Sequence, residues 1–152
     1  MDLRGGPQAV TAILFDMDGV LVDTRRSYQT AVVETVRRFP ALYLDLPSPA
    51  VTEAWVSALK AVGGFNNDWD LSAALIRGAG HFGAAFDIGS FAARLASAGG
   101  GMGSVDALLG QVTDARFSAR GLIRDLFQQV YLGADLYRQL EGQVATHAPA
   151  IG

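Results

Sequence analysis

The feature that most constrains the fold is one apolar run with strand character, followed by a long stretch in which apolar residues recur at helical spacing. The run is VTAILF, Val10–Phe15, and its β-branched and aromatic residues favour a strand buried on both faces. A sheet usually needs several strands, yet the rest of the sequence reads as helices. Either the strand pairs with residues that are not in this chain, or the run is not a strand.

Helical spacing begins soon after this run and continues almost to the end of the chain. We expect a first helix over residues 24–39, ended by Pro40. Ser48 and Pro49 fit the N-cap and the first position of a second helix. The glycine-rich segment 99–104 is expected to be a flexible connector. Further helices are predicted over residues 67–78, with Asn67 or Asp68 as the N-cap and Gly78 as the stop, and over residues 90–98, 104–112, 118–131 and 135–142.

Charge and composition argue against several classes of protein. The 12 basic and 15 acidic residues give a net charge of −3, and Lys60 is the only lysine, whereas nucleic-acid phosphates select clustered basic side chains. Cysteine is absent, which rules out disulfides, thiolate metal sites and a cysteine nucleophile. No apolar run approaches the roughly 18–20 residues of a membrane span, and the first residues do not resemble a signal peptide. We therefore expect a cytoplasmic protein whose partners include neither nucleic acid nor a membrane.

Two aspartates follow the apolar run at once, and they are the candidate catalytic residues. In a strand, side chains two residues apart point the same way, so Asp16 and Asp18 would project together from its carboxyl end. Gly19 then allows the backbone a turn that other residues resist. One carboxylate can attack phosphorus while its neighbour moves protons, and such oxygen donors suit Mg²⁺. A bare D-x-D pair, by contrast, is most often a turn or a helix cap.

The longer string FDMDGVLVDT, Phe15–Thr24, resembles the first motif of the haloacid dehalogenase superfamily. That motif is a strand followed by D-x-D-G, three apolar residues, an aspartate and a serine or threonine. The resemblance implies that Asp16 is the nucleophile and a Mg²⁺ ligand. It implies that Asp18 is the general acid and base, with its backbone carbonyl on the metal, and that the backbone amides of Met17 and Gly19 bind the phosphate. The second aspartate favours phosphate over halide, because dehalogenases of the superfamily typically lack it.

The resemblance also implies an α/β fold with a Rossmann-like core, of which this mostly helical chain would carry only the beginning. Residues 1–24 would be the start of that core, with Asp23 and Thr24 in the hinge. In subfamily IA, the subgroup similar to phosphoglycolate phosphatase, a helical cap follows the first motif, and residues 25–142 occupy that position. Residues 143–152 would be a tail at the point where the core resumes.

Within the expected cap, the segment GGFNNDWDL, Gly63–Leu71, is similar to one in an uncharacterised branch of the same subgroup. This similarity implies a substrate-facing loop in which Asn66 and Asn67 bind the substrate. The residues themselves also allow a structural alternative, in which the loop caps a helix and Trp69 anchors that helix in the core. Both interpretations stay open at this point.

The remaining motifs of the family do not appear in the sequence. The family uses a serine or threonine, a lysine and an acidic pair, all placed after the cap in this subgroup. Lys60 falls inside the cap pattern, and Asp135 and Glu141 fall in helical sequence, so none of them is a good replacement. We therefore expect a truncated or frameshifted reading frame or one half of a split protein, inactive alone. Its expected partners are a missing C-terminal half of the core or a second copy as a homodimer.

Three functions are compatible with these features. The first is a Mg²⁺-dependent phosphatase that hydrolyses a small phosphorylated metabolite through an aspartyl-phosphate intermediate, here as a fragment. The second is a non-catalytic helical binding module that keeps a relic of the first motif, because the phosphate clamp and further metal ligands are missing. The third is a phosphotransferase or mutase of the same superfamily.

Overall fold

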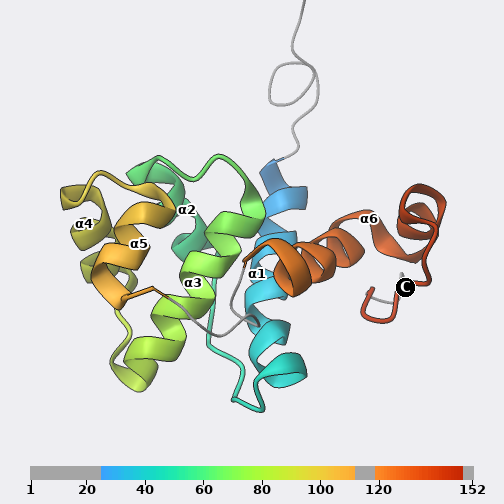
Figure 1. Ribbon diagram of the computed structural model, residues 1–152, viewed down its shortest axis with the longest axis horizontal. Helices are drawn as coiled ribbons and strands as arrows, with labels where there is room; N and C mark the ends of the chain where they lie inside the picture. The colour runs from blue at the N-terminus through green and yellow to red at the C-terminus, as the bar shows by residue number, and fades with distance from the viewer. Residues whose placement is uncertain (1–24, 112–118, 149–152) are drawn as a thin grey trace, which may run out of the picture.

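The computed structural model describes residues 25–111 and 119–148, and in this part of the chain every regular element is a helix (Figure 1). None of these helices is both long and apolar enough to cross a membrane. The elements in chain order are α1 (Arg25–Tyr43), α2 (Glu53–Val62), α3 (Asp68–Phe82), a 3₁₀ turn η1 (Gly83–Ala85), α4 (Ile88–Ser97), α5 (Gly101–Leu109), a π-helical turn η3 (Ala119–Ile123) and α6 (Arg124–Glu141).

The expected α/β fold with a core strand is wrong for this structure, because the described residues contain no strand and no sheet. The expected strand, Val10–Phe15, lies outside the described residues. Apolar side chains in the described part recur every three or four positions, so that one stripe of each helix is buried. A strand in a sheet would instead bury every second side chain, and the described residues do not follow that pattern.

Helices α1 and α3 pack against each other and form the centre of the bundle. The buried face of α1 includes one hydroxyl group, that of Thr35. Its Oγ1 donates a hydrogen bond to the carbonyl of Ala31 at 2.7 Å, so the hydroxyl has a partner inside the core. The largest fully buried apolar side chains of the two helices are Val32, Val36 and Phe39 of α1 and Leu71, Leu75 and Ile76 of α3.

Helices α2, α4 and α5 form a second group beside α3 (Figure 1). Both α2 and α5 contact α3, and α4 contacts both of them. This group extends the apolar core away from α1. Its buried apolar side chains are Val56, Leu59, Phe91, Leu95 and Val105.

Gly78 lies inside α3 and does not end it, contrary to the prediction. The reason is packing, because a Cβ atom at this position would lie 2.8 Å from Cε2 of Phe86 and 2.9 Å from Cζ of Phe91. Only glycine lets the two aromatic rings approach the helix this closely. A glycine in a helical pattern can therefore mark a close contact rather than a helix end.

The glycine-rich segment 99–104 is also not a simple connector, because α5 begins within it at Gly101. Here the chain crosses the end of α2, and the N–H of Gly101 donates to the carbonyl of Gly63 at 3.2 Å. A Cβ atom on Gly64 would lie 2.7 Å from the Gly101 nitrogen. Two glycine pairs thus let two backbones touch where any side chain would separate them.

Two further helix boundaries differ from the prediction. Helix α1 continues through Pro40, because proline removes only its own N–H donor, and the Pro40 carbonyl still accepts from the N–H of Leu44 at 3.0 Å. Helix α2 begins at Glu53 with Thr52 at the N-cap position, not at Ser48. The prolines of the preceding segment LPSPA favour extended backbone and delay the helix.

Helix α6 is bent at Gly133, whose φ of 73° and ψ of 172° suit glycine. The bend separates two parts that correspond to the predicted helices 118–131 and 135–142. Beyond it, the Tyr137 hydroxyl donates to the Asp125 carboxylate. This hydrogen bond to the anion raises the pKa of Tyr137 to about 12. A partly buried polar contact therefore holds the two parts of α6 together.

The tail after α6 returns to the bundle. The N–H of His147 donates to Oε1 of Gln129 at 2.8 Å, and its carbonyl accepts from Nη1 of Arg38 at 3.0 Å. Arg38 is itself held by Glu34, one turn earlier in α1, at 3.0 Å. These bonds join the tail to both α1 and α6.

Candidate functional site

The predicted catalytic residues Asp16 and Asp18, and the predicted phosphate-binding residues Met17 and Gly19, lie outside the described residues. In the sequence these residues come shortly before Arg25, where α1 begins. The end of the bundle where α1 begins is therefore the candidate functional surface.

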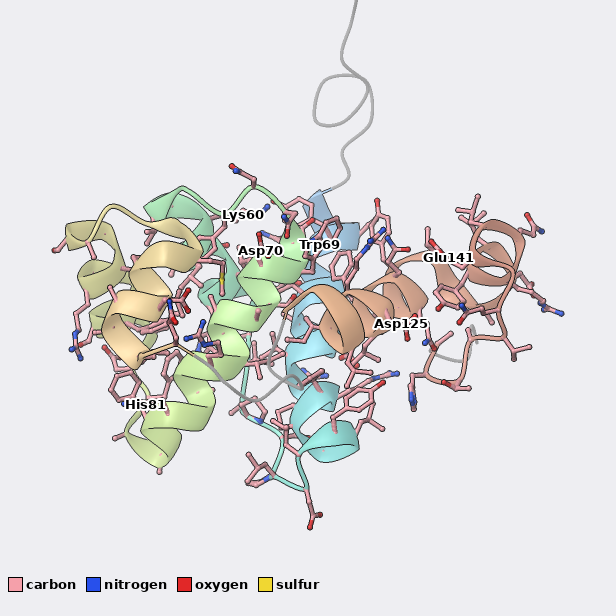
Figure 2. The ribbon with its side chains drawn as sticks, in the orientation of Figure 1. Lys60, Trp69, Asp70, His81, Asp125 and Glu141 are labelled. Carbon is pink, nitrogen blue, oxygen red and sulfur yellow. The ribbon has the colours of Figure 1, made fainter. Side chains whose placement is uncertain are left out.

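We call this surface the polar end, because charged, amide and aromatic side chains gather there. Figure 2 shows Lys60, Trp69 and Asp70 close together at this end of the bundle. They come from the end of α2 and the first turn of α3. The polar end consists of Tyr28, Lys60, Asn66, Asn67, Asp68, Trp69, Asp70 and Arg124.

Lys60 is held at the polar end by two neighbours. Its Nζ atom lies 2.7 Å from Oδ1 of Asp68 and 4.9 Å from the ring centroid of Tyr28. The Lys60 side chain keeps 36% of its surface exposed, so its ammonium can still donate to a ligand. From its position in the sequence, Lys60 is a poor replacement for the lysine that the haloacid dehalogenase superfamily places after the cap. The fold nevertheless brings Lys60 to the candidate surface.

Asn67 is the N-cap of α3. Its side-chain oxygen accepts from the N–H of Asp70 at 2.8 Å, and its Nδ2 donates to Oδ2 of the same residue at 2.9 Å. Both ends of the amide are thus used within the first turn of the helix, as the structural interpretation of this segment predicts. Asn66 is exposed beside it, and its amide is accessible from solvent.

Trp69 carries a second cation at the polar end. The guanidinium carbon of Arg124, at the start of α6, lies 5.4 Å from the Trp69 ring centroid. Phe127 meets the indole edge-on with the ring centroids 6.4 Å apart. Sequence reasoning missed Arg124, because α6 is distant in the chain and nothing near the residue marks it.

The described residues do not supply a metal centre of their own. Across residues 25–111 and 119–148, no three His, Cys, Asp or Glu side chains come close enough to hold a metal ion. Asp135 instead pairs with Arg138 at 2.8 Å in an exposed turn of α6, and Glu141 ends that helix. The expectation of Mg²⁺ therefore depends on Asp16 and Asp18.

The polar end combines cations and hydrogen-bonding groups with aromatic faces. Lys60 and Arg124 each lie over an aromatic ring, which fixes their position while their N–H groups stay available. Such an arrangement can bind and orient a small anionic or polar molecule. Bond cleavage would fall to other residues, and the sequence predicts Asp16 and Asp18 for that role.

Comparison with known proteins finds one similarity in structure and another in part of the sequence. No protein-family model matches the chain. Its structure is similar to that of phosphatase Tt82 from Thermococcus thioreducens, with a TM-score of 0.54, 30% sequence identity, and coverage of 78% of this chain and 44% of that one. Its sequence is 36% identical over 67 residues to an imidazoleglycerol-phosphate dehydratase of Phytophthora nicotianae, which is 44% of this chain and 13% of that protein. The chain thus spans less than half the length of either protein.

Proposed function

We propose that this chain is part of a Mg²⁺-dependent phosphatase that hydrolyses small phosphate monoesters. The observation that carries the proposal is the structural similarity to a solved phosphatase at 30% identity. The string FDMDGVLVDT supports it, because it resembles the first motif of the haloacid dehalogenase superfamily. In this proposal the polar end binds the ester, and Asp16 and Asp18 carry out the chemistry.

In the proposed reaction, the Asp16 carboxylate attacks phosphorus, and the bond between phosphorus and the ester oxygen breaks. Asp18 gives its proton to that oxygen, and it then takes a proton from the water that attacks the aspartyl phosphate. The products are the alcohol, inorganic phosphate and the free Asp16 carboxylate. Both residues offer the hard oxygen donors that Mg²⁺ prefers, and the bound ion would offset negative charge on the phosphoryl group.

The polar end is suited to the part of the substrate that leaves. Lys60 and Arg124 are cations, and Asn66 is an accessible amide, so they favour a polar leaving group over an apolar one. Asn67 would contribute chiefly by holding the loop in place. The sequence match to an imidazoleglycerol-phosphate dehydratase makes esters that carry an imidazole ring the first substrates to test.

The test is phosphate release by the complete gene product with and without Mg²⁺. The substrates are an aryl phosphate, imidazoleglycerol phosphate and several sugar phosphates. We expect Asp16→Asn to remove all measurable turnover, because the amide cannot act as the nucleophile. The matched control is Asp45→Asn, an exposed aspartate with a positive φ that asparagine also tolerates. Full turnover in Asp16→Asn would contradict the assigned role.

The second candidate function is the non-catalytic helical module, and the same assay separates it from the first. It predicts no Mg²⁺-dependent phosphate release from any substrate, and no difference between the Asp16→Asn and Asp45→Asn variants. A phosphotransferase would instead move phosphate to a sugar hydroxyl, and it would release little inorganic phosphate in that assay.

A further inference from the structure

A pocket lies at the end of the bundle opposite the polar end, and we call it the apolar pocket. It has a volume of about 480 Å³. Its walls come from the end of α1, the segment 44–50, the start of α2, and the end of α3 with η1. In Figure 1, α1 and α3 both end on the side of the bundle away from the start of α1. The side chains that decide its chemistry are those of Leu44, Pro47, Trp55, Ile76 and Phe86.

The lining of the apolar pocket carries no charge among the described residues, and Ser48 supplies its one hydroxyl group. Trp55 and Phe86 form an aromatic corner, with ring centroids 4.7 Å apart and planes inclined at 57°. Both rings are half-buried, so part of each faces open space. A phosphate ester would lose its hydration here and gain no cation in exchange, so the proposed substrate does not fit this pocket.

The pocket stays open because the residues along one wall are too small to fill it. That wall consists of Ala79, Gly80, Gly83 and Ala84. A Cβ atom added at Gly80 or Gly83 would have no other atom within 4 Å. Another part of the lining is held by Pro40, whose carbonyl accepts from the N–H groups of Leu44 at 3.0 Å and Leu46 at 3.2 Å. The space is therefore formed before any ligand binds.

We propose that the apolar pocket binds a small neutral aromatic or aliphatic molecule, at a site separate from the phosphatase chemistry. Its volume falls in the range of about 300–1,000 Å³ that is usual for small-molecule sites. A concave, aromatic and charge-free lining selects such a ligand over a charged one. A second copy of the chain would need a broad flat apolar surface, whereas the recess is enclosed by four segments of this chain.

The two tryptophans make the site measurable. Trp55 lines the apolar pocket and Trp69 lies at the polar end, so Trp69→Phe leaves Trp55 as the reporter and Trp55→Phe leaves Trp69. Bromobenzene is the probe, because it is small and neutral and its heavy atom quenches indole fluorescence on contact. We expect a saturable loss of Trp55 fluorescence of roughly twofold as the pocket fills, and only a shallow linear loss for Trp69.

Filling the pocket should abolish this binding. Gly80→Leu adds a side chain that occupies the open space of the pocket, so we expect the saturable quenching to be lost. Gly80 lies in helix α3, where leucine is well tolerated, so we expect the circular dichroism spectrum to be unchanged. The matched control is Gly103→Leu in α5, which also meets no atom within 4 Å but does not line the pocket, and it should bind bromobenzene as before. Should Gly80→Leu fail to fold, Ala84→Leu fills the same space from η1.

Three results would overturn the proposal. The first is linear quenching of equal slope for both tryptophans. The second is saturable quenching that survives in a folded Gly80→Leu variant. The third is a doubled mass in solution that Gly80→Leu reduces to one chain, which would assign the pocket to a second copy. Because bromobenzene binding needs neither Mg²⁺ nor Asp16, loss of phosphatase activity in Asp16→Asn leaves this measurement unaffected.

Discussion

The two ends of the helical bundle differ in chemistry although the same two helices build both. Helix α1 is 19 residues long, and α3 is 15, so at ~1.5 Å per residue the ends are separated by more than about 20 Å. The polar end carries a lysine, an arginine and two aspartates beside aromatic rings, whereas the described lining of the apolar pocket carries no charge. One helix can therefore present charged side chains at one end and border an uncharged recess at the other.

The difference follows from what helix ends require. Asp68 and Asp70 occupy the first turn of α3, where carboxylates interact favourably with the helix dipole, and the Asn67 side-chain oxygen accepts from the free N–H of Asp70. At the other end, the small residues Ala79 and Gly80 lie in the last turn of α3, and α1 finishes against a proline-rich segment, so apolar surface is left facing a recess. The middle of both helices is one apolar core that connects the two ends.

The largest expected effect comes from the shared core. Leu75 is fully buried in the middle of α3, and Leu75→Ala should lower the free energy of unfolding by about 2–5 kcal/mol through lost burial and a residual cavity. Urea unfolding followed separately by Trp55 and by Trp69 should show equal shifts, since both ends depend on one core. Leu140→Ala, at a residue 64% exposed on α6, should change little. A shift seen by only one tryptophan would show that the ends unfold independently.

A smaller effect is expected from two glycines of α3 that lie near the apolar pocket. Gly78→Ala places a methyl group within 3 Å of two aromatic rings and should cost about 1–3 kcal/mol as those rings move. Gly80→Ala meets nothing within 4 Å and should stabilise the helix by about 0.5–1 kcal/mol. Opposite shifts of the melting temperature at these two positions would confirm a tight contact beside an open space. Equal shifts would contradict it.

The smallest effect is expected at the polar end. Asn67→Ala removes the N-cap of α3 and should cost about 1 kcal/mol of stability. Asn66→Ala, one residue earlier and exposed, should change stability by less than about 0.5 kcal/mol. If Asn66 contacts the substrate, its alanine variant should raise KM with little change in melting temperature. The reverse pattern, with Asn66 governing stability, would contradict the cap that we assign to Asn67.

Much of the local structure is predictable from the residues alone. The N-cap at Asn67 is marked by an amide next to an acidic first turn, and the apolar stripes of α1, α3 and α6 follow helical spacing. The string FDMDGVLVDT predicts phosphoryl chemistry through its resemblance to the first motif of the haloacid dehalogenase superfamily, and this stays a prediction. The expected α/β fold rested on the family resemblance and on the apolar run Val10–Phe15, and it is wrong for the described residues, where every regular element is a helix.

The tertiary structure decided which distant residues meet. Gly78 and the glycines 99–101 read as helix ends and a connector, and the fold uses them for close contacts with Phe86, Phe91 and the end of α2. The packing of α6 places Arg124 over Trp69, and the convergence of four segments opens the apolar pocket. Periodicity and capping act over a few residues along the chain, so the sequence determines them directly. Contacts between residues tens of positions apart depend on how whole helices pack, and no local pattern records that.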